Sequence, residues 1–356
     1  MESLRAEVIS TDRLNINCWV AGAEDGTPLL LVHGNLVSGR WWEDVTRRLP
    51  DGVRAVAPDL RGFGLTDPAP VDATRGLRDW SDDLHALVGA LGWGGGSRIH
   101  IAGWSLGGGV VEQYAIDHAA DLASVTLLAP ISPYGFGGTR LDGSPLYDDF
   151  AGTGGGAVNP DFSRRLSERD PSEDDPTSSP RVIMRSFFYD GANAPEADEP
   201  MLFAEFMNTA CGEDNYPGSM SMSENWPGIA PGDRGGQNAM SPKYCNTAAF
   251  AEIDPKPPVI WIWGSKDPVV SDTSAFDFGV LGEMGAVPGW PGAEVYPAQP
   301  QVAQTRALLE RYAAGGGSFE EVCLDGVGHG ALVERPDMVS ELLTKQIAGV
   351  SAEGSA

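Results

Sequence analysis

Short apolar runs alternate with segments of helical periodicity over roughly the first 130 residues. Largely apolar runs of this length are typical of strands buried on both faces of a sheet. They cover residues 27–32, 53–57, 98–102 and 124–129. The clearest amphipathic helix is expected over residues 77–91, with apolar positions on one face and charged positions on the other. This alternation predicts a mostly parallel central sheet flanked by helices.

The alternation stops near residue 131 and resumes near residue 256. The segment between contains Gly-rich pieces, an acidic Ser/Pro stretch and short helical fragments, one of them amphipathic over residues 196–209. Beyond it, strands are expected over 258–263 and 319–324, and helices over 302–312 and 336–347. We therefore predict an α/β protein whose sheet domain consists of residues 1–131 and 256–356. An inserted, mainly helical cap of residues 132–255 interrupts it.

Charge narrows the class of partner. The chain has 356 residues, with 24 basic and 50 acidic side chains and a net charge of −26. Such a surface repels nucleic acid and anionic membranes, so we expect neither as a partner. The N-terminal residues lack the apolar core of a secretory signal, and no apolar stretch reaches the length of a membrane span, so a cytoplasmic protein is expected. A homodimer is compatible with the sequence, but no feature requires one.

Four widely spaced cysteines form no CxxC pair, which argues against a zinc site and a dense disulfide framework. They are Cys18, Cys211, Cys245 and Cys323. We expect reduced thiols. A bridge between Cys211 and Cys245 is the less favoured alternative.

A candidate nucleophile is Ser105, in the pattern Gly103-x-Ser105-x-Gly107. In a chain with 46 glycines the pattern alone is weak, but here an expected strand precedes it and a helical pattern follows. A catalytic serine needs a sharp strand-to-helix turn, and the flanking glycines leave room for that turn. The N–H groups at the start of the helix then lie where negative charge develops. An ordinary Gly-rich turn is the alternative.

The candidate general base is His329, between two glycines in a loop after the last expected strand. We expect these glycines to give the imidazole an open, mobile position. The acid that orients it should follow an earlier strand, and Asp267 does so, with Asp272 and then Asp254 as competitors. The order serine, acid, histidine is that of one known arrangement of the triad. Of the other histidines, the ones expected to be structural or exposed are His85, His100 and His118.

Acyl transfer also needs two N–H donors for the developing oxyanion. We expect them at Leu106, which follows the nucleophile, and at Asn35, in the loop after the first buried strand. His33 in this loop is expected to shape it by bonding backbone groups, and not to act as a base. Trp104, beside the nucleophile, either packs under the sheet or contacts substrate.

Five ordered motifs together resemble the α/β-hydrolase superfamily, in its branch of capped serine esterases and lactonases. They are His33-Gly-Asn35, Asp59-Leu-Arg-Gly-Phe-Gly64, Gly103-Trp-Ser-Leu-Gly107, Gly264-Ser-Lys-Asp267 and Gly328-His329. The resemblance covers residues 15–130 and 255–349 and implies the fold and the triad, but says little about substrate. Haloalkane dehalogenases and epoxide hydrolases of the superfamily use an aspartate as nucleophile. Serine at position 105 excludes an alkyl-enzyme ester.

The cap bears on substrate class, because six of the nine methionines fall between residues 184 and 240, among several aromatic residues. These side chains form either an adaptable apolar pocket wall or the core of the cap. We expect hydrolysis of a moderately large, mostly apolar ester or lactone through an acyl-enzyme on Ser105, with no metal and no cofactor. Cleavage of a C–C bond by the same triad and a catalytically silent binding protein are the alternatives. The segment 287–292 is expected to be a rigid loop over the sheet edge or against the cap.

Overall fold

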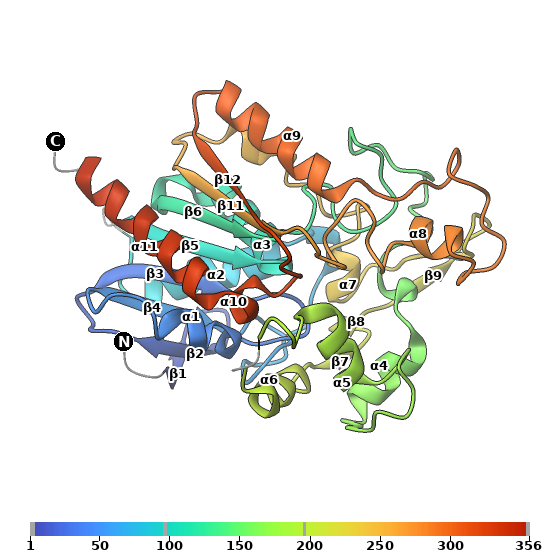
Figure 1. Ribbon diagram of the computed structural model, residues 1–356, viewed down its shortest axis with the longest axis horizontal. Coiled ribbons are helices and arrows are strands. Elements are labelled where there is room, and N and C mark those ends of the chain that lie inside the picture. Colours follow the sequence, from blue (N-terminus) through green and yellow to red (C-terminus); the bar gives the residue numbers. More distant parts are fainter. Residues whose placement is uncertain (1–3, 95–97, 195–196, 354–356) are drawn as a thin grey trace.

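The computed structural model describes residues 4–94, 98–194 and 197–353. A twisted eight-stranded sheet forms its centre, in the strand order β1-β2-β4-β3-β5-β6-β11-β12 (Figure 1). Strands β1 and β2 are antiparallel to their neighbours, and the six strands from β4 onward run parallel. The strands are β1 (Arg5–Ser10), β2 (Asn15–Ala21), β3 (Thr27–Val32), β4 (Val53–Pro58), β5 (Ile99–Trp104), β6 (Leu122–Leu128), β11 (Val259–Gly264) and β12 (Phe319–Leu324).

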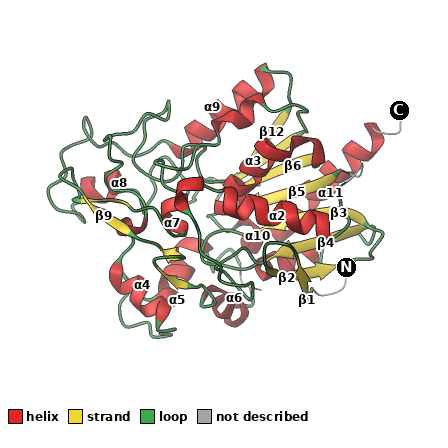
Figure 2. Cartoon of the chain, turned by 180° about the vertical axis from the view of Figure 1, so that it is seen from behind, coloured by secondary structure: helices red, strands yellow, loops and turns green. Residues whose placement is uncertain are grey.

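Helices cover both faces of this sheet, as Figures 1 and 2 show from opposite sides. One face carries α2 (Arg78–Ala90), α3 (Leu106–His118) and α9 (Gln301–Ala314). The other carries α1 (Glu43–Thr46), α10 (Ala331–Glu334) and α11 (Pro336–Glu353). Each face has its own buried apolar cluster, so the central strands β3, β5, β6 and β11 are covered on both sides.

The predicted fold class is confirmed, because the strands and helices expected in the sheet domain lie within about two residues of their expected ranges, except that the last helix continues six residues beyond its expected end at residue 347. The antiparallel strands β1 and β2 were missed. Strand β1 has the sequence Arg-Ala-Glu-Val-Ile-Ser and is exposed along much of its length. Charged, exposed residues are typical of an edge strand, and they leave no apolar run to detect.

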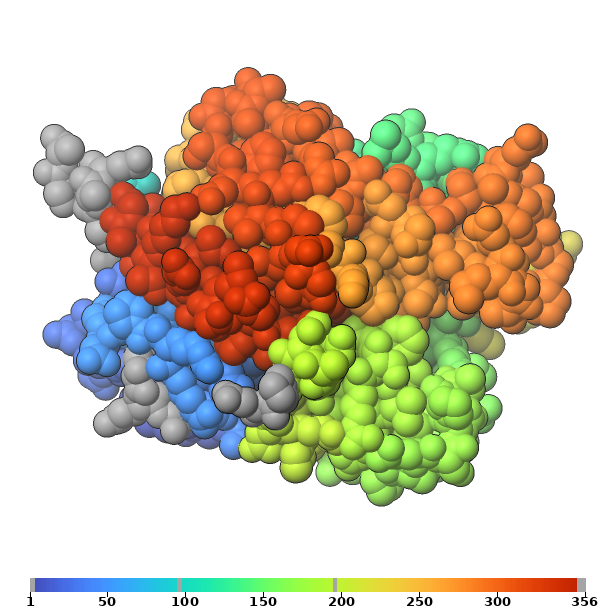
Figure 3. All heavy atoms as spheres, viewed as in Figure 1, coloured from blue at the N-terminus to red at the C-terminus, as the bar shows by residue number. Residues whose placement is uncertain are grey.

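The inserted segment contains short helices connected by long irregular stretches. These helices are α4 (Pro160–Ser167), α5 (Pro180–Ile183), the π-helical turn η5 (Met184–Phe188), α6 (Glu199–Phe206) and α7 (Gly236–Ala239). Two small strand pairs accompany them: β7 (Cys211–Gly212) with β8 (Tyr216–Pro217), and β9 (Met220–Met222) with β10 (Ile229–Pro231). In Figure 3 the yellow-green part of this segment lies directly against the red C-terminal part of the chain.

A second excursion follows β11 and contains α8 (Phe278–Glu283). Its loop 287–292 packs against the cap, one of the two expected positions: Trp226 Nε1 donates to Pro288 O at 2.9 Å. Trp290 Nε1 donates to Tyr296 O at 3.0 Å and holds the loop to its own stem. The excursion thus extends the cap, although the boundaries predicted from sequence assign it to the sheet domain.

The four cysteines are free, so no Cys211–Cys245 bridge forms. Cys18 and Cys245 are buried, whereas Cys323 is exposed. Within the described residues, no helix is both long enough and apolar enough to cross a lipid bilayer.

Candidate active site

Ser105 lies in the sharp turn between β5 and α3, with a backbone φ of 58° and ψ of −120°. This conformation is strained for a residue with a side chain. The flanking glycines permit it, because a Cβ on Gly103 would lie 2.2 Å from Gly107 O and one on Gly107 would lie 2.4 Å from His33 O. The sequence therefore folds here into the turn that presents a serine at the C-terminal edge of a parallel sheet.

Asp267 and His329 meet at the same edge of the sheet, at the ends of β11 and β12. His329 Nδ1 and Asp267 Oδ2 are 2.8 Å apart, and both side chains are almost fully buried. The other carboxylate oxygen of Asp267 accepts the N–H groups of Val269 at 2.7 Å and Val270 at 2.9 Å. These bonds hold the carboxylate as an acceptor, which favours the tautomer with hydrogen on Nδ1 of His329 and a basic Nε2.

The competing acid Asp272 has a different task, since its Oδ1 accepts the N–H group of Val302 at 2.8 Å at the start of α9. Ser105 and His329 line one cavity. Among the described residues, no hydrogen bond joins Ser105 Oγ to the His329 ring, and catalytic hydrogen bonds are often long in unliganded enzymes.

The glycines around His329 do not leave the imidazole in an open position, contrary to the sequence-based expectation. His329 is only 2% exposed. A Cβ on Gly330 would lie 2.2 Å from Phe188 O of the cap, and one on Gly328 would lie 2.8 Å from Glu334 Oε1. The glycines are needed because other chain segments press closely on both sides of the histidine.

Glu334, which the sequence analysis missed, connects this loop to the cap. Its buried carboxylate accepts the N–H groups of Gly328 and of Asp190, each at 3.0 Å. It also accepts the Asn193 side-chain amide at 3.1 Å. In the sequence Glu334 stands out only by its place five residues beyond the candidate catalytic histidine, and no motif assigns that position a role.

The expected oxyanion donors flank the nucleophile. Leu106 is the first residue of α3, where helical N–H groups have no partner within the helix. Asn35 lies in the loop after β3. In the part of the chain that the structure describes, the backbone N–H groups of Leu106 and Asn35 donate to no other group. A Cβ on Gly34 would lie 3.1 Å from the Ser105 Cβ, so this glycine lets the loop approach the nucleophile.

His33 makes only backbone hydrogen bonds among the described residues. Its Nε2 accepts the Leu60 N–H at 2.8 Å, and Nδ1 lies 2.7 Å from Gly34 O. Burial lowers the pKa of His33 to about 4, so the ring is neutral and can accept at one nitrogen while it donates at the other. This arrangement fits the shaping of the oxyanion loop.

Trp104 does not line the cavity, so a role in substrate contact is not supported. It is fully buried and stacks on Trp41 with ring centroids 5.6 Å apart. Its Nε1 donates to His329 O at 2.9 Å. The side chain therefore packs beneath the site and holds the backbone of the histidine. His100 is also structural, with Nδ1 2.7 Å from Ser124 Oγ.

The cavity at Ser105 has a volume of about 430 Å³. Its walls come from the N-terminal and C-terminal parts of the sheet domain, from the cap and from the excursion after β11. Six aromatic side chains contribute: Phe136, Phe162, Phe187, Phe188, Tyr216 and Phe276. Polar amides are also present, and Asn35 Nδ2 donates to Gln237 Oε1 at 3.3 Å.

Of the two expectations for the methionines, the buried core of the cap holds for Met184 and Met207, and no methionine wall of the pocket forms among the described residues. Of the methionines between residues 184 and 240, only Met240 lines the cavity among the described residues. Met184 is fully buried in the cap, and Met220 and Met222 are exposed on β9. Clustering in the sequence did not translate into one surface, because the cap chain reverses direction several times.

The family of the chain follows from comparison with known proteins. A family model described as the alpha/beta hydrolase family matches residues 29–342. The chain therefore belongs to the α/β hydrolase family, which confirms the resemblance and the fold.

Individual relatives match smaller parts. A fluoroacetate dehalogenase from a Burkholderia species is 30% identical over 136 residues, which are 37% of this chain and 43% of the relative. Lipase 1 of Psychrobacter immobilis is 32% identical over 127 residues, 34% of this chain and 39% of the relative. The chain thus matches less than half the length of these curated relatives. The crystal structure of an esterase from Rhodococcus sp. ECU1013 superposes with a TM-score of 0.59 at 19% identity. The superposition covers 98% of this chain and all of the esterase, and it shows a shared fold.

Proposed function

We propose that the protein is a serine hydrolase that cleaves a neutral, mostly apolar carboxylic ester or lactone through an acyl-enzyme on Ser105. The observation that carries the proposal is the 2.8 Å contact between Asp267 and His329, at the cavity that His329 shares with Ser105. A buried histidine with one nitrogen engaged by a fixed carboxylate is suited to take a proton at the other.

The reaction proceeds in two halves. Ser105 Oγ attacks the carbonyl carbon while His329 Nε2 takes the hydroxyl proton, and the N–H groups of Leu106 and Asn35 receive the oxyanion. Collapse of the tetrahedral intermediate expels the alcohol, which His329 protonates, and leaves the acyl-enzyme. Water then attacks with the same histidine as base, and the acid is released. The Asp267 carboxylate stabilises the imidazolium in both halves.

The cavity walls support a neutral substrate. Among the described residues, no Asp, Glu, Lys or Arg side chain lines the cavity. A carboxylate substrate such as that named for the Burkholderia relative would enter without a cation to compensate for its lost hydration. The six aromatic rings instead favour an apolar acyl or alcohol group, and the volume of about 430 Å³ lies within the usual range for small-molecule sites.

Labelling with a fluorophosphonate tests the nucleophile. One adduct on Ser105, mapped by peptide mass, is expected in the wild type and in the control Ser265→Ala, which removes an exposed hydroxyl in the loop after β11. Ser105→Ala should give no adduct. A panel of neutral esters and lactones, alongside anionic acyl donors, then tests the substrate class. Wild-type protein that is folded yet unlabelled, or that prefers anionic donors, would contradict the proposal.

A further inference from the structure

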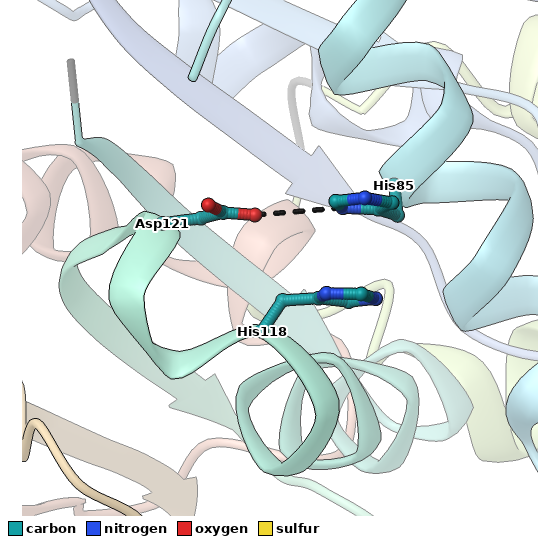
Figure 4. A group of neighbouring side chains, drawn as sticks. All are labelled: His85, His118 and Asp121. Carbon is teal, nitrogen blue, oxygen red and sulfur yellow. Dashed lines mark ion pairs between the residues drawn. The ribbon is translucent and has the colours of Figure 1, made fainter. Parts of the chain in front are cut away.

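Two of the five histidines lie together on the surface of the sheet domain, away from the cavity. His85 on α2 and His118 at the end of α3 stack with ring centroids 3.7 Å apart and an interplanar angle of 3° (Figure 4). Asp121, three residues beyond His118, places Oδ2 3.4 Å from His85 Nδ1. One ligand atom from each residue lies within 4.8 Å of the others.

Tyr114 orients the carboxylate, and the imidazole of His118 keeps both ring nitrogens available. Tyr114 OH donates to Asp121 Oδ2 at 3.0 Å, as a fixed second-layer partner does for a metal ligand. Among the described residues, the ring nitrogens of His118 have no hydrogen-bond partner. Stacking therefore satisfies the faces of the two rings, while in the ring planes only His85 Nδ1 faces another group, the Asp121 carboxylate.

We propose that His85, His118 and Asp121 form a binding site for one divalent transition-metal ion, with Zn²⁺ as the ion that fits best. Two imidazoles and one carboxylate are the ligand types that zinc accepts, at about 2.0 to 2.2 Å, and water can complete a tetrahedral set. Calcium and magnesium prefer oxygen donors and are disfavoured.

Binding requires one adjustment of the side chains. A metal bonds to nitrogen in the plane of the imidazole, so two rings stacked in parallel cannot share an ion until one of them turns. The His85 side chain is 49% exposed and has room to turn, whereas Asp121 is held by Tyr114. The chain charge of −26 favours a cation at this surface.

The consequence is a cross-link between α2 and α3, and not a second catalytic centre. The 13 residues of α3 span about 20 Å, with Leu106 beside the nucleophile at one end and His118 at the other. An ion that binds only the folded chain raises the folding equilibrium constant about 100-fold when its concentration is 100 times Kd. The stability of the helices α2 and α3, which pack behind Ser105, thus depends on the concentration of the metal ion.

Calorimetric titration of Zn²⁺ into untagged, EDTA-treated full-length protein tests the site. One equivalent should bind with a micromolar or tighter Kd. His118→Ala and His85→Ala should each weaken zinc binding at least 10-fold. Loss of a residue that only holds a metal ligand in place already lowers metal affinity about 10- to 100-fold, and these two residues are the ligands themselves. Asp117→Asn, which removes a neighbouring carboxylate paired with Arg78, should leave Kd unchanged.

Two further measurements separate other outcomes. His329→Gln should retain the equivalent of zinc; its loss there would assign the ion to the triad and overturn the proposal. Co²⁺ added to wild-type protein should give the ligand-field absorption of a four-coordinate ion, which needs no variant to fold. A wild type that binds no zinc below millimolar concentration, or equal Kd values for wild type and the double histidine variant, would also overturn it.

Discussion

Replacing Glu334 by alanine removes the carboxylate that holds both the loop of His329 and the adjoining cap segment. The buried backbone N–H group of Gly328 and the partly exposed N–H group of Asp190 lose their acceptor. An unsatisfied buried donor costs about 1–3 kcal/mol, and water can replace the acceptor at Asp190, so the free energy of unfolding should fall by about 1–3 kcal/mol. Glu334→Gln keeps one acceptor oxygen and should lose about half as much.

Activity should fall through misplacement of His329 and not through lost contact with substrate. A displacement of about 1 Å in a catalytic group costs roughly 100-fold in rate. We expect Glu334→Ala to lower kcat on a neutral ester toward that extent with little change in KM, and Glu334→Gln to restore part of it. Urea unfolding midpoints and steady-state kinetics measure the two effects separately.

The control for this prediction is Glu341→Ala, which removes an exposed carboxylate on α11 and should change neither quantity. Because stability does not depend on the proposed reaction, the unfolding measurement stands even if the substrate class is wrong. Equal urea midpoints for wild type and Glu334→Ala would refute the structural reasoning. A lower midpoint with unchanged kcat would refute the positioning role alone.

Three further predictions follow from particular contacts. Asp267→Asn should lower kcat about 10,000-fold while the protein remains folded, since an amide at this position favours the wrong tautomer of His329. Retained activity of the variant would contradict this prediction. Burial raises the pKa of Glu112 from 4.5 to about 8, so the folded chain holds a proton that the unfolded chain releases. As pH rises between these two pKa values, wild type should therefore lose stability relative to Glu112→Gln by about 1.4 kcal/mol per pH unit. The same difference between the urea midpoints of the two proteins at about pH 6 and at about pH 8 would disprove it. Phe276→Ala should shift preference toward longer acyl chains by about 1–3 kcal/mol in kcat/KM ratios, because Phe276 lines the cavity and contacts Phe187; an unchanged chain-length profile would remove it from the binding site.

The sequence alone determined the features that short segments encode. The run of β5, the glycines around Ser105 and the pattern of α3 predict a strand, a tight turn and a helix, because each depends on neighbours a few residues apart. Parallel strands end at one edge of the sheet, so Asp267 and His329, each following a strand, were expected there with the nucleophile. Their roles in catalysis remain predictions.

Only the tertiary structure decided which distant segments share a surface. The cavity is lined by Phe276 from the excursion after β11 and by Phe188 from the cap, while most of the clustered methionines lie elsewhere. Glu334 connects the histidine loop to the cap, and His85 meets His118 across two helices. Such contacts depend on how helices and loops pack in three dimensions, and neither periodicity nor motif spacing carries that information.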